Sequence, residues 1–363
     1  MLRAAVRLMG GIGAVRSGRR YRRARRLRSG KRGVVAVIGT LLALLVFFAL
    51  FGIFLTQYVP LWMTDNEAQF TNAAATSFAQ FKGGVDTQYA LGIPQILGTP
   101  FTVSSGAVPL IAQPTEGILD FLPQTCPGGF YALGISGASV ANYGQPVNPS
   151  FCVFENQTMS VGPGGSGPFY QVAATGVLNM VLPNRYYPSE MFSFENDGVV
   201  QIQSGSHQIM AVSPPFNVTR LAGNVSVTSS FLQQYGNTTS VIAQGSEEVY
   251  SHLRYSQQVT SNGKAGASFN YLFEVGTQYP CAWSTFLQAQ MNATGLPKML
   301  SPGVGVQSYN FTNPVTHFAT IPVTGGCYSP TSATTLLVVN LHAINYANLF
   351  YAGVEVVVGI GGV

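Results

Sequence analysis

The sequence predicts an N-terminal transmembrane helix that continues into an amphipathic stalk, followed by a mainly antiparallel, sandwich-like all-β ectodomain with one short helix. Three observations support this fold class. An uncharged apolar run begins at Val34, apolar residues then recur at helical spacing, and short β-branched and aromatic runs fill the chain after about Gln88. We therefore expect a basic cytoplasmic leader over 1–33, a transmembrane helix and stalk over 34–86, and a β-rich extracellular domain over 87–363.

The charged residues are distributed unevenly along the 363 residues. Residues 1–33 hold 12 of the 18 Lys and Arg residues and no acidic residue, whereas the rest of the chain has 6 basic and 13 acidic side chains. Because no basic stripe continues beyond the leader, no nucleic-acid partner is expected. Charged residues make up only 9% of the chain, and a polar but uncharged surface of this kind suits the outside of a cell.

The apolar run from Val34 to Thr56 is long enough to cross a membrane. Its 23 residues contain no charge. At 1.5 Å per residue they form a helix of about 34 Å, against a hydrocarbon core of about 30 Å. The basic residues cluster before the run, which predicts a single-pass protein of the cell membrane with its N-terminus in the cytoplasm and its C-terminal part outside. The run is too long for an ordinary secretory signal, and no small-x-small cleavage site follows it.

The junction between leader and helix, K-R-G-V-V-A-V-I-G-T at 31–40, resembles the class III signal peptide of archaeal type IV pilins and archaellins. In that family a prepilin-type peptidase cuts the basic leader directly after a glycine. The resemblance implies cleavage between Gly33 and Val34, and it places Val37, Ile38 and Gly39 in the mature membrane anchor. It also implies contacts with other pilin-like subunits through the N-terminal helix.

Two positions depart from the family pattern. Archaeal pilins commonly read V-S-P-V-I-G after the cut, whereas this chain has Val35 and Ala36 in place of the serine and the proline. An uncleaved type II membrane anchor therefore stays open as an alternative, because hydropathy alone does not separate the two.

An amphipathic pattern follows the apolar run. Seven apolar residues recur at intervals of three, four or seven and define one helix face: Val59, Met63, Phe70, Ala74, Phe78, Phe81 and Val85. Pro60 is expected to kink the helix near the outer membrane surface, and Gly83-Gly84 to end it after Lys82, which we place among the polar residues between the apolar ones. The apolar face could pack on neighbouring subunits or on the chain's own β domain, and the sequence leaves both open.

The ectodomain is expected to form an antiparallel sandwich with one helix. Its clearest strand segments are Phe101–Ser104, Tyr170–Leu182, Val199–Gln203, Asn224–Leu232, Ser240–Gln244, Val249–Val259, Tyr271–Val275, Val304–Phe311, Thr335–Leu341 and Phe350–Val358. In the segment Val249–Val259, the alternation of apolar and polar residues predicts one buried face, made by Val249, Leu253, Tyr255 and Val259. The helix lies between Pro280 and Gly295, with an apolar stripe of Trp283, Phe286, Leu287 and Met291.

A glycine- and proline-rich stretch at 162–168 is the best candidate for a linker within the ectodomain. It would separate a small lobe (89–161) from a main lobe (169–363). A single β domain with one long surface loop stays open as the alternative.

The chain has four cysteines, Cys126, Cys152, Cys281 and Cys327, with no C-x-x-C pair. Zinc favours closely spaced ligands, so no metal is expected. In an oxidising exterior the simplest interpretation is two disulfides, and three pairings are possible. We favour Cys126–Cys152 with Cys281–Cys327, because shorter loops close more readily. Four buried thiols are the alternative.

The expected outer part of the chain carries six N-x-Ser/Thr sequons, which are candidate glycosylation sites. Their asparagines are Asn156, Asn217, Asn224, Asn237, Asn292 and Asn310. Asn148 is excluded by the proline that follows it.

The segment 182–200, L-P-N-R-Y-Y-P-S-E-M-F-S-F-E-N-D-G-V-V, is similar to one in uncharacterised archaeal pilin-like secreted proteins. No activity accompanies that likeness. Physically, Asn196-Asp197-Gly198 predicts a turn that leads into a strand. The aromatic residues before the turn are expected in the core or at a sheet edge: Tyr186, Tyr187, Phe192 and Phe194.

No catalytic or cofactor motif is present in the sequence. The pattern as a whole favours a non-enzymatic role, as a structural or adhesive surface protein of an archaeal cell that resembles a type IV pilin and binds no cofactor. Two alternatives stay open. One is a membrane-anchored β-sandwich that binds a surface glycan or protein, and the other is an extracellular hydrolase whose carboxylates come from distant strands.

Overall fold

The computed structural model describes residues 29–108, 112–123, 130–136, 169–204, 207–221, 224–262, 269–293, 307–311, 318–321 and 335–359. The chain forms two compact units, Met1–Tyr58 and Val59–Val363. The predicted linker, 162–168, lies outside the described residues, so the division into two lobes stays a prediction.

The first unit contains helix α1 (Ser29–Ile53) and a π-helical turn, η1 (Phe54–Tyr58). Large apolar side chains point outward all around α1. The structure thus places near the N-terminus one helix that is long and apolar enough to cross a membrane. The π-helical turn ends two residues before Pro60, whose ring would clash with the carbonyl of residue 56 in a regular α-helix, and the helix accommodates the proline there.

The second unit begins with helix α2 (Val59–Leu91), which is the predicted stalk. All seven residues of the predicted apolar face are buried, none of them more than 5% exposed. Five of them, from Phe70 to Val85, belong to a core shared with the chain's own strands, and α2 contacts β1 and β12 of one sheet and β6 and β7 of another. Of the two partners that the sequence left open for this face, the chain's own β domain is the one that covers it.

The expected helix end at Gly83-Gly84 is wrong. The helix continues to Leu91 because the turns beyond the glycines are anchored: Val85 and Gln88 are fully buried. This burial outweighs the low helix propensity of glycine, about 1 kcal/mol per residue. The helix ends instead at Gly92, whose φ of 64° suits glycine and where Ile93 N–H donates to the Gln88 carbonyl and Gly92 N–H to the Tyr89 carbonyl.

Gly83→Ala is expected to stabilise the second unit by about 1 kcal/mol, because a Cβ at Gly83 meets no atom within 4 Å and alanine favours the helix. Urea unfolding of the detergent-solubilised chain measures the change. Gly92→Ala is the matched control, and it should destabilise by a similar amount because alanine is strained at that φ. A loss of stability in Gly83→Ala would contradict this account of the helix.

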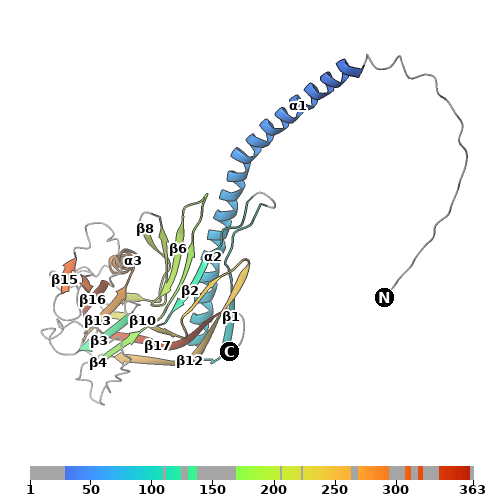
Figure 1. Ribbon diagram of the computed structural model, residues 1–363. Coiled ribbons are helices and arrows are strands. Elements are labelled where there is room, and N and C mark those ends of the chain that lie inside the picture. Colours follow the sequence, from blue (N-terminus) through green and yellow to red (C-terminus); the bar gives the residue numbers. More distant parts are fainter. Residues whose placement is uncertain are drawn as a thin grey trace, which may run out of the picture. The chain divides into compact units, whose positions relative to one another are not determined.

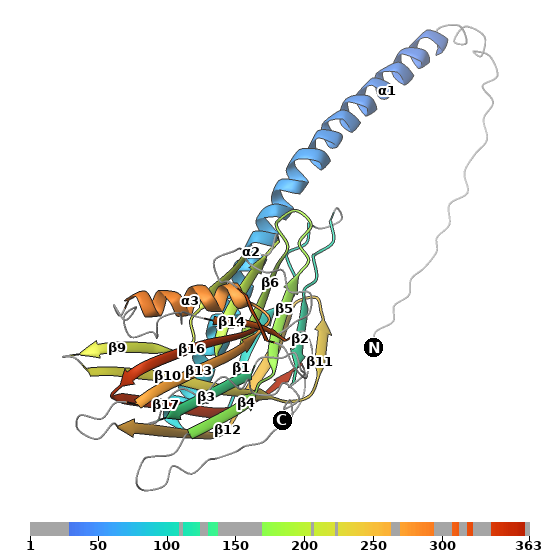
Figure 2. The same ribbon diagram turned by 90° about the vertical axis from the view of Figure 1, so that its left-hand side faces the viewer.

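The described strands form three sheets (Figures 1 and 2). The first has the order β1 (Ile96–Thr102), β12 (Ser246–Asn262), β17 (Tyr346–Val358), β10 (Asn224–Tyr235) and β9 (Asn217–Leu221). The second has the order β11 (Thr239–Ile242), β2 (Ile118–Leu122), β5 (Val177–Leu182), β6 (Glu190–Glu195), β7 (Gly198–Gln203) and β8 (His207–Val212). The third has the order β15 (Phe318–Ile321), β14 (Gln307–Phe311), β16 (Thr335–Ile344), β13 (Phe269–Thr277), β3 (Phe130–Ser136) and β4 (Phe169–Ala174).

The pairing is mainly antiparallel, as predicted. The exception is the parallel pair β10–β17, which runs from Ser226↔Tyr346 to Tyr235↔Glu355. The predicted buried face of β12 holds for Val249 and Leu253 but fails at Tyr255, which is 37% exposed. The reason is a β-bulge between Leu253 and Tyr255, which shifts the alternation by one residue.

Two hydrophobic cores hold the second unit together. One joins α2 to the first and second sheets through aromatic pairs such as Phe78–Phe101 and Phe81–Phe194. The other lies under helix α3 (Pro280–Ala293), which packs on β16 and β8 (Figures 1 and 2). The four residues of the predicted α3 stripe are all buried, which confirms that helix.

The predicted strand Tyr170–Leu182 is wrong in its extent, because it is two strands in two different sheets. The chain leaves β4 of the third sheet at Thr175-Gly176 and enters β5 of the second. Gly176 approaches its neighbours closely: a Cβ there would lie 2.7 Å from the Phe121 ring, and its N–H donates to the Gln234 carbonyl. Glycine is the residue that such a close crossing requires.

Candidate functional site

Helix α2 buries polar as well as apolar side chains against the β domain. Glu67, Thr71, Ser77, Lys82 and Gln88 are each at most 6% exposed. We call these residues and the groups they contact the stalk–domain interface. Buried polar groups in proteins are normally hydrogen-bonded, so their partners show what holds the helix in place.

Glu67 binds one loop of the β domain through its backbone. Its carboxylate accepts hydrogen bonds from the N–H groups of Arg185 (3.1 Å), Tyr186 (2.7 Å) and Tyr187 (2.8 Å). It also accepts one from Thr115 Oγ1 at 2.6 Å. Four donors therefore converge on one carboxylate, an arrangement that fixes the 185–187 loop to the helix.

These bonds determine the charge state of Glu67. Burial alone raises a carboxyl pKa, but the hydrogen bonds from Thr115 and from the three backbone N–H groups together outweigh it and lower the pKa of Glu67 below its ordinary value. Glu67 is thus ionised over the whole physiological range. One turn after Glu67 in α2, Thr71 Oγ1 accepts a hydrogen bond from Asn184 Nδ2. This bond attaches the start of the same loop to the helix.

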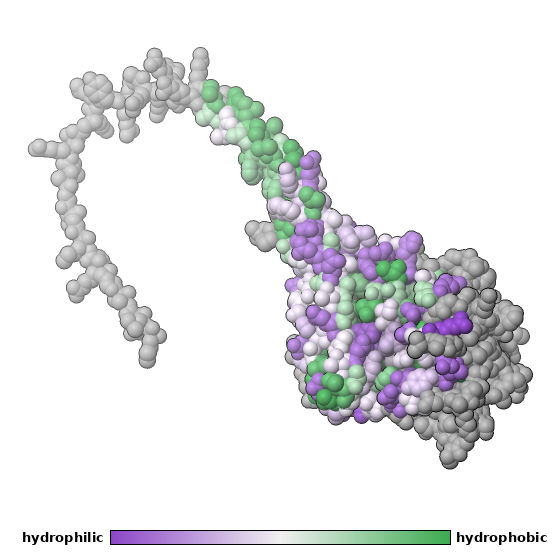
Figure 3. All heavy atoms as spheres, turned by 180° about the vertical axis from the view of Figure 1, so that it is seen from behind, coloured by the Kyte–Doolittle hydropathy of each residue, from purple (hydrophilic) through white to green (hydrophobic). Residues whose placement is uncertain are grey.

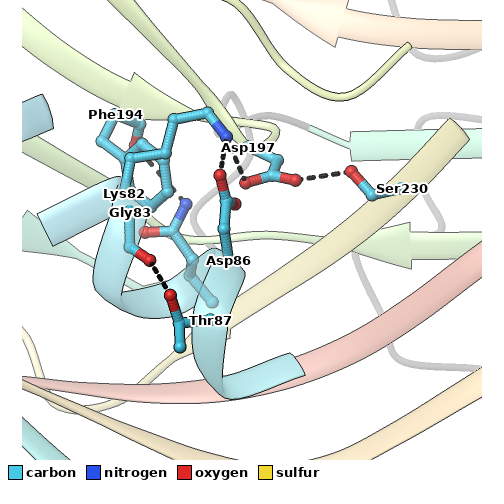
Figure 4. A network of polar contacts seen from close by, with 8 residues as sticks. Lys82, Gly83, Asp86, Thr87, Phe194, Asp197 and Ser230 are labelled. Carbon is cyan, nitrogen blue, oxygen red and sulfur yellow. Dashed lines mark hydrogen bonds and ion pairs between the residues drawn. The ribbon is translucent and has the colours of Figure 1, made fainter. Parts of the chain in front are cut away.

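A charged cluster lies about four turns beyond Glu67, nearer the end of α2 (Figure 4). Lys82 Nζ is 2.6 Å from Asp86 Oδ2 and 3.5 Å from Asp197 Oδ1. The side chains of Lys82 and Asp197 are 4% and 0% exposed, and Ser230 Oγ of β10 donates to Asp197 Oδ2. Lys82, which the sequence places among the polar residues between the apolar ones, is buried because its ammonium group has two carboxylate partners.

Asp197 belongs to the predicted turn, which the structure confirms. Asn196 and Asp197 have φ values of 49° and 60° and join β6 to β7, with Glu195 paired to Gly198. Burial, moderated by the nearby Lys82 and reinforced by Asp86, raises the pKa of Asp197 to about 7. Burial also raises the pKa of Tyr89, and the carboxylates of Asp197 and Asp86 raise it further.

Glu195, at the end of β6, is a third buried acid. Its Oε1 accepts hydrogen bonds from Trp283 Nε1 of α3 at 2.8 Å and from Thr277 Oγ1. Burial outweighs these bonds and raises the pKa of Glu195 to about 7. Trp283 is fully buried, so Glu195 links β6 to the core under α3.

The stalk–domain interface is a structural contact that attaches α2 to the β domain. Each of the three acids is fully buried, so a dissolved substrate cannot reach it without opening the domain. Within the described residues no group of three or more His, Cys, Asp or Glu side chains is placed to hold a metal ion. What the arrangement does is fix α2 to two loops and to β10.

The predicted site residues fall in three places. Gly33 and Val34 lie inside α1, and Val37, Ile38 and Gly39 lie on its outward-facing surface. Cys281 is disulfide-bonded, while Cys126, Cys152 and Cys327 lie outside the described residues, so the pairing stays a prediction. Four sequon asparagines are exposed, namely Asn217, Asn224, Asn237 and Asn292. Asn310 lies in β14, and Asn156 lies outside the described residues.

Four residues of these contacts were not among the site residues predicted from the sequence: Glu67, Lys82, Glu195 and Asp197. One signal was available: the segment 182–200 supplies the Glu67-binding loop, two aromatic residues that pack on α2 (Phe192 and Phe194) and the Asp197 turn. Its aromatic residues and its turn were predicted from the sequence, but nothing in the sequence paired the segment with α2.

Comparison with known proteins adds no relative. No protein-family model, no curated protein and no solved structure matches this chain.

Proposed function

We propose that this chain is a pilin-like surface protein, anchored by α1 with its N-terminus in the cytoplasm, that displays its β domain outside the cell. The observation that carries the proposal is the contrast between the two halves of the helix. The large apolar residues of α1 are exposed, whereas the seven apolar residues of the α2 face are buried. Figure 3 shows the surface of α1 as hydrophobic, while the visible face of the β domain is mostly hydrophilic.

A helix that exposes apolar side chains on all sides is stable only in lipid or against other apolar helices. This supports a membrane anchor, and it also supports assembly with other pilin-like subunits through α1. Since α2 is already covered by its own domain, contacts with such subunits would be made by α1 and by the outer surface of the β domain. The four exposed sequons suit glycosylation on the outer side, which is part of the same proposal.

The proposal is tested by the mature N-terminus, measured by mass spectrometry of the protein from the membrane fraction of archaeal cells. A chain that begins at Val34 is expected, since a prepilin-type peptidase would cut after Gly33. Gly33→Val should block the cut and leave the leader attached. Gly30→Val is the matched control, because it makes the same change three residues earlier and should leave processing intact.

A wild-type chain that retains Met1 would overturn the pilin-like proposal. It would leave the alternative of an uncleaved type II anchor that displays a β domain for binding a surface glycan or protein. Burial of the α2 face within one chain favours that alternative as a second candidate, because the stalk then needs no neighbouring subunit. Filaments that contain the protein, seen by electron microscopy, would separate the two.

A further inference from the structure

We propose that Lys82 and Asp197 join in an intramolecular amide bond between Lys82 Nζ and Asp197 Cγ, with Asp86 carrying the protons. The bond would link α2 covalently to the β6–β7 turn. Three features of the described structure carry the inference: the amine and the carboxyl group are in reach of each other, both are shielded from water, and a second carboxylate touches the amine (Figure 4).

The reacting groups are already close. Nζ lies 3.5 Å from Asp197 Oδ1, the oxygen bonded to the Cγ that the amine attacks. Neither partner can drift away easily, because Lys82 extends from a buried helix face. Asp197 sits in a two-residue turn held by the β6–β7 ladder. The pair is thus held at a high effective concentration by the fold.

The site divides the two oxygens of Asp197 between two roles. Ser230 Oγ donates to Oδ2, so this oxygen is the one stabilised when negative charge develops on it. Oδ1 accepts no hydrogen bond from the described residues and faces the amine. Oδ1 is therefore the oxygen that departs.

The step balances without an oxidant, a reductant or a co-reactant. Asp86 Oδ2, which lies 2.6 Å from Lys82 Nζ, relays one proton from the ammonium to Asp197 Oδ1, so that a neutral amine attacks Cγ of the protonated acid. Asp86 then carries a second proton from the amine nitrogen to Oδ1, the Cγ–Oδ1 bond breaks, and one water leaves. An ammonium and a carboxylate have become an amide and a water, so the buried charges of both partners disappear.

The surroundings favour this outcome over a lasting ion pair. Burial raises the pKa of Asp197 to about 7, so the protonated acid, which is the electrophilic form, is populated at neutral pH. Buried ions carry a desolvation cost of several kcal/mol each, and converting a charged pair into a neutral amide removes that cost for both. Phe194, three residues before Asp197, is fully buried and packs on Phe81, the residue next to Lys82.

The bond is tested on full-length protein purified in detergent, reduced, denatured and digested with a protease that cuts at aromatic residues. Tandem mass spectrometry is expected to find a branched peptide in which Lys82 is joined to Asp197 with the loss of one water. Most of the wild-type chain should be linked. Asp86→Asn keeps both partners but removes the proton carrier, and it is expected to yield linear peptides only.

Ser230→Ala should slow the reaction and leave a mixture of linked and unlinked chains. Thr87→Ala is the control: Thr87 is next to Asp86 but lies on the exposed side of α2, so this variant should remain fully linked. Finding only linear peptides with a free Lys82 amine in the wild type would overturn the proposal. So would a linear peptide that is one water lighter, because attack by the Gly198 nitrogen on Asp197 gives a succinimide of that mass. The result does not depend on whether the leader is cut.

Discussion

Replacing Glu67 by alanine is expected to lower the free energy of unfolding of the second unit by about 4 kcal/mol. The change leaves three backbone N–H groups, at Arg185, Tyr186 and Tyr187, and the Thr115 hydroxyl without their acceptor. An unsatisfied buried donor costs about 1–3 kcal/mol, and some of these groups will regain water as the loop moves. Chemical denaturation of the detergent-solubilised chain at pH 7 measures the loss.

Hydrogen exchange gives a local measurement of the same contact. Arg185 and Tyr186 are exposed, yet their amides bond to Glu67 and should exchange slowly in the wild type. In Glu67→Ala they should exchange as freely as an open loop. The matched control is Asp65→Ala: Asp65 is on the same helix but exposed and bonds only Gln69, so its loss should change stability by about 0.5 kcal/mol or less. Equal effects of the two substitutions would show that Glu67 does not hold the loop.

Acid should weaken this contact in the wild type. Because the folded pKa of Glu67 is lowered from 4.5, its contribution is fully present above that pH and is lost as the pH falls through the folded value. Glu67→Ala should lack this part of the acid dependence. The 185–187 amides report it directly.

The sequence was sufficient to predict the elements whose pattern is local. Phe70, Phe78 and Phe81 recur at helical spacing, and all three are buried where that spacing places them. The stripe of α3 was predicted in the same way. Helical periodicity can be identified from a short stretch of sequence, so predicting the buried face requires no knowledge of the surface on which it packs.

The features that failed depend on partners far away in the chain. β6 was not predicted because Glu190 and Glu195 bound it, and charged residues are rarely buried. Here Gln201 donates to Glu190, and Trp283 and Thr277 donate to Glu195. The burial of Lys82 was not predicted for the same reason, since its partner Asp197 lies 115 positions later in the sequence. Local patterns do not reveal which distant strand will supply a counter-charge.

Buried acids with distant partners also make the free energy of unfolding depend on pH, and the amino-acid composition does not indicate which acids these are. Burial raises the pKa of Glu195 from 4.5 to about 7, so the folded chain keeps a proton that the unfolded chain releases. The contribution of Glu195 is therefore full below pH 4.5 and declines as the pH rises to about 7. A shift of this size corresponds to a decline of about 3 kcal/mol.

Glu195→Gln is expected to remove that decline. The glutamine carbonyl can still accept the bonds from Trp283 Nε1 and Thr277 Oγ1, but it does not ionise. Denaturation of the detergent-solubilised protein at pH 4.5 and pH 8 should show a difference between the two conditions that is about 3 kcal/mol smaller in the variant than in the wild type. Glu248→Gln, at the exposed start of β12, is the matched control and should leave the difference unchanged.

Asp197 titrates in the same direction as Glu195 as long as its carboxyl is free. A linked chain has no such carboxyl, so its stability should become nearly flat above pH 4.5 once Glu195 is replaced, whereas an unlinked chain should keep a second decline.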